Sequence, residues 1–410
     1  MRKMKDSGVE WIGEIPEDWI ITKYKYFSKN GMGLTILKTE VSSNGVPIYS
    51  ATQSNEIFGY ISNPGLLLKY GDLVIPARGN SIGFVTFVVD EEATCTQTTI
   101  YSMLHDICKK YAYYCCYGLQ KYWFNYDDTA IPQITVGQIE NNILPFPPID
   151  IQHLIADYLD DKCGKIDRYI EKQQKIIDKL KEYKQAVITE AVTKGLNPDV
   201  PMKDSGIEWI GMIPEHWDVK KLKYATDILR GKFNHRPRND PDYYDGQYPF
   251  IQTGDVARAT KYINDFSQTL NQKGYDVSKE FPSGSVVMTI AANVADVSIL
   301  NFRACFPDSI VGFIPKDVDK LYLFYILKAM RQQLLKNAII STQLNLNIEI
   351  IKEEFIAIPS KREQNEIILY LENTCDEINS AIAKQTRIIE KLTEYKKSLI
   401  YEAVTGKMEV

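Results

Sequence analysis

The 410-residue sequence lacks the cysteine and histidine spacings that mark a metal site or a disulfide framework. Its seven cysteines and four histidines form no C-x-x-C or H-x-x-x-H pair, so neither a zinc ribbon nor a set of disulfides is predicted. A run of about 18 apolar residues, which a membrane helix needs, is also missing, and no apolar stretch follows residues 1–6 as in a secretion signal. We therefore expect a cytoplasmic protein with reduced thiols and no membrane association.

An excess of positive charge is missing as well. The chain carries 48 basic and 53 acidic side chains, for a net charge of −5, which excludes a protein that coats nucleic acid through bulk charge. At 44% hydrophobic and 25% charged residues the composition is that of a globular protein, and the length predicts two or three domains.

Catalytic motifs are absent too. No phosphate-binding G-x-x-x-x-G-K-[ST] loop occurs. The tetrapeptide nearest to an amino-methyltransferase motif, DPDY at residues 240–243, has Asp in place of the second Pro and is interpreted as a turn. Cys115 and Cys116 lie in an aromatic segment without a nearby histidine, which favours packing over nucleophilic chemistry. The sequence offers no active site.

What the sequence does contain is an internal repeat. Residues 4–19 and 202–217 agree at 13 of 16 positions with an offset of 198, and residues 158–193 and 370–405 agree at 19 of 36 with an offset of 212. The second copy has therefore gained 14 residues between its two similar ends. Because the segment after residue 402 stops where a third copy would begin, we predict adjacent termini and two halves related by a pseudo-twofold axis.

The second repeated segment of each copy predicts a long helix. It has no proline, and apolar residues recur every seven positions, as in a coiled coil. One seam contains Leu159, Ile166, Gln173, Leu180 and Val187, and its counterpart contains Leu371, Ile378, Gln385, Leu392 and Leu399. We expect the two helices to form an antiparallel coiled coil in which Gln173 and Gln385 help to fix the register, unless these glutamines merely occupy a solvated seam. Cys163 and Cys375 are interpreted as small core residues.

The variable stretches between the repeats are predicted to be α+β domains. Strand-like runs occur at residues 83–89 and 285–290, and helical patterns at residues 107–123 and 321–335. The predicted division is residues 1–148 for the first domain, 149–201 for the first helix and linker, 202–359 for the second domain and 360–410 for the second helix.

Each domain has a local basic stripe although neither is basic overall. Four lysines and no acidic residue lie between Thr22 and Thr39, and after the second box seven basic residues accompany only Asp227. Such stripes bind the negatively charged phosphates of nucleic acid. Arg and Asn side chains can also bind the edges of guanine and adenine bases. The candidate DNA-binding residues are Lys23, Lys25, Lys29, Asn30, Lys38, Arg78, Asn80, Arg230, Lys232, Asn234, His235, Arg236, Arg238 and Asn293.

The whole chain resembles the specificity subunit of type I restriction-modification systems. The resemblance rests on the boxes DSGVEWIG (residues 6–13) and DSGIEWIG (204–211), on IPEDW (15–19) and IPEHW (213–217), and on IPSKREQ at residues 358–364. In the first copy Ile151–Gln152 replaces the Glu–Gln of the pattern, which puts a contact at the start of that helix in doubt.

This resemblance implies a noncatalytic subunit with two target recognition domains, each of which reads one half of an asymmetric site in double-stranded DNA. The helices would set the spacing and dock two modification (methyltransferase) subunits, which restriction subunits join. No cofactor is expected on this chain; S-adenosylmethionine, ATP and Mg²⁺ are expected on the partner subunits.

Two other interpretations remain open. In one, the chain is an adaptor that binds protein or carbohydrate through two modules, with the coil as spacer; this leaves the paired basic stripes unexplained. In the other, the chain is itself a DNA-modifying enzyme, which the missing motifs disfavour.

A short insertion in either long helix is expected to change the spacing between the two half-sites and to leave their sequences unchanged, because the helices act as the spacer. Methylome sequencing of cells that carry the variant measures both. Altered bases within a half-site, at constant spacing, would contradict the role of the helices as a ruler.

Overall fold

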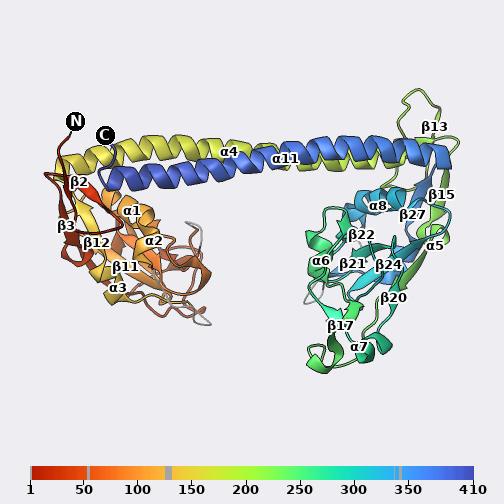
Figure 1. The fold of residues 1–410 in the computed structure, drawn as a ribbon, viewed down its shortest axis with the longest axis horizontal. Coiled ribbons are helices and arrows are strands. Elements are labelled where there is room, and N and C mark those ends of the chain that lie inside the picture. Colours follow the sequence, from red (N-terminus) through yellow and green to blue (C-terminus); the bar gives the residue numbers. More distant parts are fainter. Residues whose placement is uncertain (1, 53–55, 125–131, 337, 341–343) are drawn as a thin grey trace. The chain divides into compact units, whose positions relative to one another are not determined.

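The fold was analysed in a computed structural model, which describes residues 2–52, 56–124, 132–336, 338–340 and 344–410 (Figure 1). The chain forms two compact units. The first comprises residues 1–175 and 385–410, and the second comprises residues 176–384. Each unit therefore contains one α+β domain together with one end of each long helix, and the predicted fold class is confirmed.

The first unit is built from short strands and helices that end in the long helix α4. In chain order they are β1 (Met4–Asp6), β2 (Glu14–Pro16), β3 (Ile20–Lys23), η1 (Tyr24–Tyr26), β4 (Ser28–Met32), β5 (Val46–Tyr49), β6 (Gly59–Ile61), β7 (Leu68–Lys69), β8 (Leu73–Pro76), η2 (Gly79–Ser81), β9 (Thr86–Phe87), β10 (Glu92–Cys95), β11 (Thr99–Leu104), α1 (Lys109–Gly118), α2 (Gln120–Trp123), α3 (Val136–Asn141), β12 (Ile143–Phe146) and α4 (Ile149–Lys194).

The second unit follows the same plan with additional elements and ends in α11. Its elements are β13 (Met202–Asp204), β14 (Met212–Pro214), β15 (Asp218–Lys221), α5 (Leu222–Ala225), β16 (Thr226–Arg230), η3 (Pro241–Tyr243), β17 (Tyr244–Pro249), α6 (Thr253–Arg258), β18 (Tyr262–Ile263), β19 (Thr269–Leu270), α7 (Gln272–Asp276), β20 (Glu280–Phe281), β21 (Val286–Thr289), β22 (Val297–Leu300), β23 (Ala304–Cys305), β24 (Ile310–Pro315), α8 (Lys320–Ala329), α9 (Arg331–Lys336), β25 (Ile339–Ile340), β26 (Leu344–Asn345), α10 (Ile348–Glu353), β27 (Phe355–Ile358) and α11 (Lys361–Val404).

The central sheets of the two units share three antiparallel strands. Their order is β4-β11-β8-β9 in the first unit and β16-β24-β21-β22-β18 in the second. Strands β4 and β16 differ by 198 positions and β8 and β21 by 213. The extra length of the second copy therefore lies between β16 and β21, the segment that contains most of the predicted DNA-binding residues of that domain.

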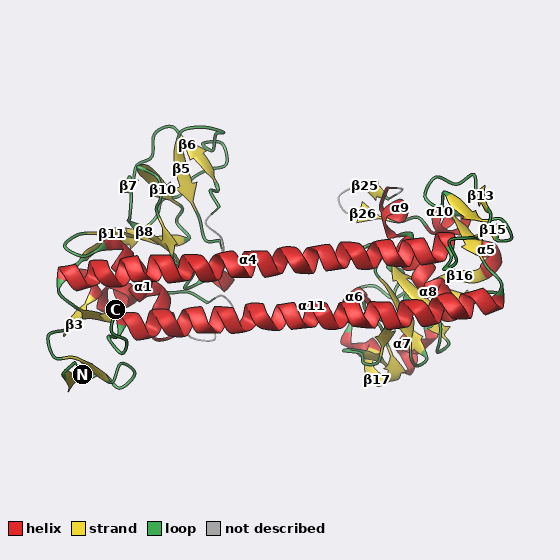
Figure 2. Cartoon of the chain, turned by 90° about the horizontal axis from the view of Figure 1, so that it is seen from above, coloured by secondary structure: helices red, strands yellow, loops and turns green. Residues whose placement is uncertain are grey.

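The predicted long helices are present, and their ends pack against each other within each unit. In the first unit Lys396 of α11 pairs with Asp167 of α4 at 2.7 Å, and in the second Lys184 of α4 donates to Asn379 of α11 at 2.7 Å. Lys184 and Lys396 lie 212 positions apart in the sequence, as do Asp167 and Asn379, so the two pairs are equivalent. At each end the two helices lie side by side (Figure 2), and the order of the paired residues makes them antiparallel, as expected. Gln173 and Gln385 are both half-buried, and their part in the register stays a prediction.

A buried tyrosine joins each domain to the helices. The Tyr111 hydroxyl donates toward the carbonyl of Pro145 in β12, at 2.8 Å, and that of Val404 in α11, at 3.2 Å. In the second unit the Tyr322 hydroxyl lies 3.2 Å from the carbonyl of Ala357 in β27 and 3.3 Å from that of Val192 in α4. Burial raises the pKa of both phenols well above the usual value. Each hydroxyl therefore stays protonated and links the last strand of a domain to the helix of the other repeat.

The chain closes on itself as the repeat predicts. At the end of α4, Gly195 (φ +74°) lies against the indole ring of Trp217, and after α11 Gly406 (φ +71°) lies against Pro16 and Trp19. A Cβ at Gly406 would approach Pro16 Cδ to 2.4 Å, so only glycine fits. The last turn of α11 thus meets the first box, and the marked termini lie near each other (Figure 1).

The contact put in doubt by Ile151 is indeed lost in the first copy. In the second copy the Trp217 indole donates to Glu363 at 3.1 Å, and His216 bonds the same carboxylate at 2.7 Å. Burial would raise the pKa of Glu363, but the hydrogen bonds from His216, Trp217 and Ser360 lower it to about 2. In the first copy the buried Trp19 Nε1 has no acceptor among the described residues.

All seven cysteines are buried and unpaired within the described structure. Burial raises the pKa of Cys163 to about 11 and that of Cys116 to about 12, so these thiols stay protonated. The interpretation of the cysteines as core residues is confirmed.

We expect Gln152→Leu and Gln364→Leu to destabilise the protein by about 1–3 kcal/mol each. Gln152 is 0% and Gln364 1% exposed. Gln152 accepts from the Cys108 backbone N–H at 2.9 Å and donates to the Pro147 carbonyl at 2.9 Å. Gln364 makes the same bonds with Asp319 and Pro359. Leucine leaves a buried donor and acceptor unpaired.

Urea unfolding measures the effect, and Lys179→Ala, at an exposed position of α4, is the control. An unchanged unfolding free energy in both glutamine variants would show that these bonds do not stabilise the joints.

Candidate nucleic-acid interface

Three loops of the second unit leave the same end of its central sheet. Strand β16 ends at Arg230, which pairs with Val311 of β24, and β21 ends at Thr289, which pairs with Ile310. Because the strands are antiparallel, the loops after β16 and β21 meet the loop before β24. We call residues 231–243, 290–296 and 306–309 the strand-end loops of the second unit.

Asp308 organises the arginines of these loops. Its carboxylate pairs with the guanidinium groups of Arg238 and, at 3.6 Å, of Arg236. Its backbone carbonyl accepts from Arg230 Nε at 2.6 Å. Arg236 also donates to the carbonyls of Phe233 and His235, both at 2.7 Å. Three of the predicted DNA-binding arginines therefore converge on one acidic residue.

The same loop holds His235 in place. Its Nε2 lies 2.9 Å from Asp240, and its ring stacks on that of Tyr243 with the centroids 3.8 Å apart. The Tyr244 hydroxyl donates to the Arg238 carbonyl. His235 thus supports the loop, and a DNA contact of its own stays a prediction.

Three of the predicted residues, Lys232, Asn234 and Asn293, are exposed on this surface. Within the described part of the chain, no ion pair or side-chain hydrogen bond involves them. Asn293 follows Ala292 in the turn after β21, where Ala292 and Ala295 have φ values of 63° and 64°. Alanine rarely adopts positive φ, and such strain is typically retained at functional sites.

The first unit presents matching strand-end loops, residues 33–45, 77–85 and 96–98. Pro76, the last residue of β8, pairs with Thr99 of β11, and Met32, the last of β4, with Ile100. Arg78, Asn80 and Lys38 lie exposed in these loops. Gly79 has a φ of 75° at the position that corresponds to Ala292, so Asn80 and Asn293 occupy equivalent places in the two turns.

The predicted basic stripe of the first unit is divided among several elements. Lys23 of β3 donates to Asn141 at 3.2 Å, and Lys25 lies over the Tyr26 ring at 5.5 Å, before β4 begins. Lys29 and Asn30 lie within β4, where Asn30 donates to the Ser28 hydroxyl at 2.9 Å and its own oxygen is buried without a described partner. At about 3.3 Å per residue, β4 separates Lys23 and Lys25 from the strand-end loops. The contact of Lys23 and Lys25 with DNA stays a prediction.

The stripe of the second unit is also less basic than its sequence indicates. Lys221 and Lys223 pair with Glu353 of α10, and these hydrogen bonds lower the pKa of Glu353 to about 2. Sequence reasoning missed Glu353 and Asp308 because they lie 130 and 70 positions from Lys223 and Arg238. Only the fold brings them to the stripe.

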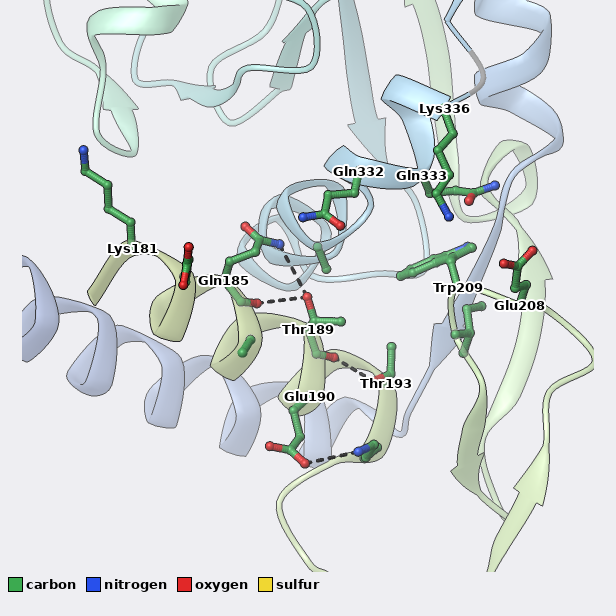
Figure 3. Close-up of a pocket in the computed structure, with 15 residues that line it drawn as sticks. Lys181, Gln185, Thr189, Glu190, Thr193, Glu208, Trp209, Gln332, Gln333 and Lys336 are labelled. Carbon is green, nitrogen blue, oxygen red and sulfur yellow. Dashed lines mark hydrogen bonds and ion pairs between the residues drawn. The ribbon is translucent and has the colours of Figure 1, made fainter. Parts of the chain in front are cut away.

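A separate groove of about 890 Å³ opens in the second unit between α4, α9 and the second box. Polar side chains of α4, such as Gln185 and Thr189, face Gln332 and Lys336 across it, with Trp209 at one end (Figure 3). Trp209 Nε1 is buried without a partner among the described atoms. In the first unit the matching Trp11 stacks on Tyr122 at 4.4 Å.

The structure also bears on metals and membranes. Among the residues that it describes, no three His, Cys, Asp or Glu side chains gather into a potential metal site. Nor does any helix within those ranges have the length and apolar character needed to cross a membrane.

A family model described as "Type I restriction modification DNA specificity domain" matches residues 16–182 and 214–392. The two matches cover both domains and most of both long helices. The chain therefore belongs to the type I restriction-modification DNA specificity family, as the repeated boxes indicated.

Relatives from Methanocaldococcus jannaschii match over nearly their whole lengths. The type I restriction enzyme MjaVIII specificity subunit is 23% identical over 97% of this chain and 94% of its own. The putative MjaX specificity subunit is 27% identical over 97% and 96%. Both are named as specificity subunits, so the expected class of noncatalytic specificity subunit is confirmed.

The fold is also found in a solved structure that concerns the assembly and conformational transition of the type I R-M system. The two chains are 14% identical, and the superposition has a TM-score of 0.68. It covers 96% of this chain and 99% of the other. At this identity the likeness concerns the fold alone.

We expect Lys232→Ala to weaken DNA binding by the assembled complex and to reduce the salt slope of log K by about 0.9, because one uncompensated cation is lost. Arg236→Ala is expected to change the slope less, because Asp308 already compensates that charge. Titrations at several salt concentrations measure both slopes. Lys220→Ala, which removes a lysine 3.7 Å from Asp218 near the other end of β16, is the control. Equal slopes for Lys232→Ala and wild type would exclude Lys232 from the interface.

Proposed function

We propose that this chain is the DNA-reading subunit of a type I restriction-modification complex. Each domain reads one half of an asymmetric, bipartite site in double-stranded DNA through its strand-end loops. The observation that carries this proposal is the equivalent position of Asn80 in one unit and Asn293 in the other, with Arg78 in the same turn as Asn80. Both turns follow matching strands, contain residues with positive φ and present exposed polar side chains. Arg and Asn can bind guanine and adenine edges through paired hydrogen bonds.

The long helices are proposed to dock two modification subunits. Tyr183 and Tyr395 lie at equivalent positions of α4 and α11 and are 56% and 58% exposed. Exposed tyrosines are enriched at protein interfaces, and one in each repeat supports two equivalent partners. Restriction subunits would join this complex. S-adenosylmethionine, ATP and Mg²⁺ would be bound by the partners.

The adaptor interpretation makes a different prediction about DNA. An adaptor for sugar or peptide would bind its ligands without regard to a DNA sequence. The proposed function therefore predicts that each turn controls one half of a DNA target and has no influence on the other.

The test is methylome sequencing of cells that carry the gene, lack it or carry a variant, with the modification subunits present. We expect adenine methylation at a bipartite site that disappears without the gene. Arg78→Ala should relax the sequence requirement in one half of the methylated site. Asn293→Ala should relax it in the other half, because each variant removes contacts of a different domain. Lys220→Ala should leave the motif unchanged.

Two outcomes would contradict the proposal. One is methylation that does not depend on the gene. The other is a change in the same half-site with both variants. Methyl transfer by the purified chain alone would show that it is an enzyme and not a specificity subunit.

A further inference from the structure

We infer that Asp308 determines specificity by positioning the arginines of the second unit for base edges and by opposing their use as nonspecific phosphate ligands. This inference rests on the proposed function. It assigns a role to an acidic residue in a surface that would otherwise be described only by its cations.

The geometry shows a built cluster. The Asp308 side chain is 36% exposed, whereas those of Arg236 and Arg238 are 53% and 46% exposed. The Asp308 side chain is therefore less exposed than those of the two arginines that it holds. The base of the loop is fixed by Phe233, which is 2% exposed and packs on Phe250, and whose carbonyl accepts from Arg236.

Such an arrangement reduces the conformational entropy that the arginine side chains lose when they bind DNA. A guanidinium group has five N–H donors in a rigid plane. Asp308 and the backbone carbonyls take part of this set, and the remaining donors have no protein partner among the described residues. A guanidinium group held in this way is preorganised for the two acceptors of a guanine edge.

The charge of Asp308 acts differently on the two kinds of DNA contact. A phosphate group would have to approach a carboxylate that already pairs with the same arginines, and two anions repel. Base edges carry no net charge, so the pair of Asp308 and Arg238 can persist beside them. Asp308 therefore weakens binding to the DNA phosphates more than binding to the base edges. Because phosphate contacts do not depend on sequence, this difference raises specificity.

The first unit supports this reading by contrast. Gln97 lies two residues before β11, as Asp308 lies two residues before β24. Gln97 accepts from the Thr35 hydroxyl at 2.6 Å, and the adjoining residues 33–45 contain no arginine. The acid thus occurs in the copy whose loop carries the arginines, and the same position in the other copy tolerates a neutral amide.

The experiment compares wild type with Asp308→Asn in the complex with modification subunits. Affinities are measured at several salt concentrations for two duplexes. One contains the target sequence that methylome sequencing identifies, and in the other the half-site read by the second unit is scrambled. For the variant we expect tighter binding to the scrambled duplex, a steeper salt slope by about one ion, and a ratio of the two affinities that falls about tenfold.

Controls separate positioning from charge and from folding. Asp218→Asn removes the same charge near the opposite end of β16 and should leave the ratio unchanged. Asp308→Glu should restore most of the ratio. Asp308→Gln, which installs the residue of the first unit, should behave as Asp308→Asn, with unfolding unchanged.

An unchanged ratio in both neutral variants would overturn the inference, as would an equal fall of the ratio in Asp218→Asn. Failure of the proposed function looks different, because the wild-type complex would then not distinguish the two duplexes.

Discussion

The structure depends on the joint between each domain and the helix of the other repeat. Tyr111 and Tyr322 sit at equivalent places in α1 and α8, and each hydroxyl lies within hydrogen-bonding distance of one strand carbonyl and one helix carbonyl. Because the second carbonyl comes from the opposite repeat in both cases, neither repeat completes its own unit. This exchange explains why the compact units cut through both long helices, and it means that each unit needs a helix from both repeats.

The same scaffold carries two different surfaces. Matching strands end at the same edge of the sheet in both units and deliver loops there, but the extra length of the second copy lies directly after β16. Glycine occupies the strained position of the first turn at Gly79, whereas the second copy uses Ala292. Gln97 stands where the other copy has Asp308. Divergence is thus concentrated in loops that strand pairing supports, as expected of a protein whose two domains have different ligands.

The charge of a surface cannot be obtained by counting charged residues along the sequence. Counted along the sequence, the second stripe faces one acid, but in the structure Glu353 and Asp308 pair with four of its seven basic side chains. Lys232 remains open to a ligand. A near-neutral domain can therefore present a small number of cations at defined positions, which favours selective over general binding to a polyanion.

The sequence by itself determined the repeat, the two long antiparallel helices, the closure of the chain and the family, because heptad periodicity and repeated boxes are local patterns. It also identified the turn residues Arg78, Asn80 and Asn293. Only the tertiary structure decided which cations share a surface. Pairing of β16 with β24 brings Asp308 to Arg238 across 70 positions. Pairing between distant strands sets such neighbours, and no spacing along the chain encodes it.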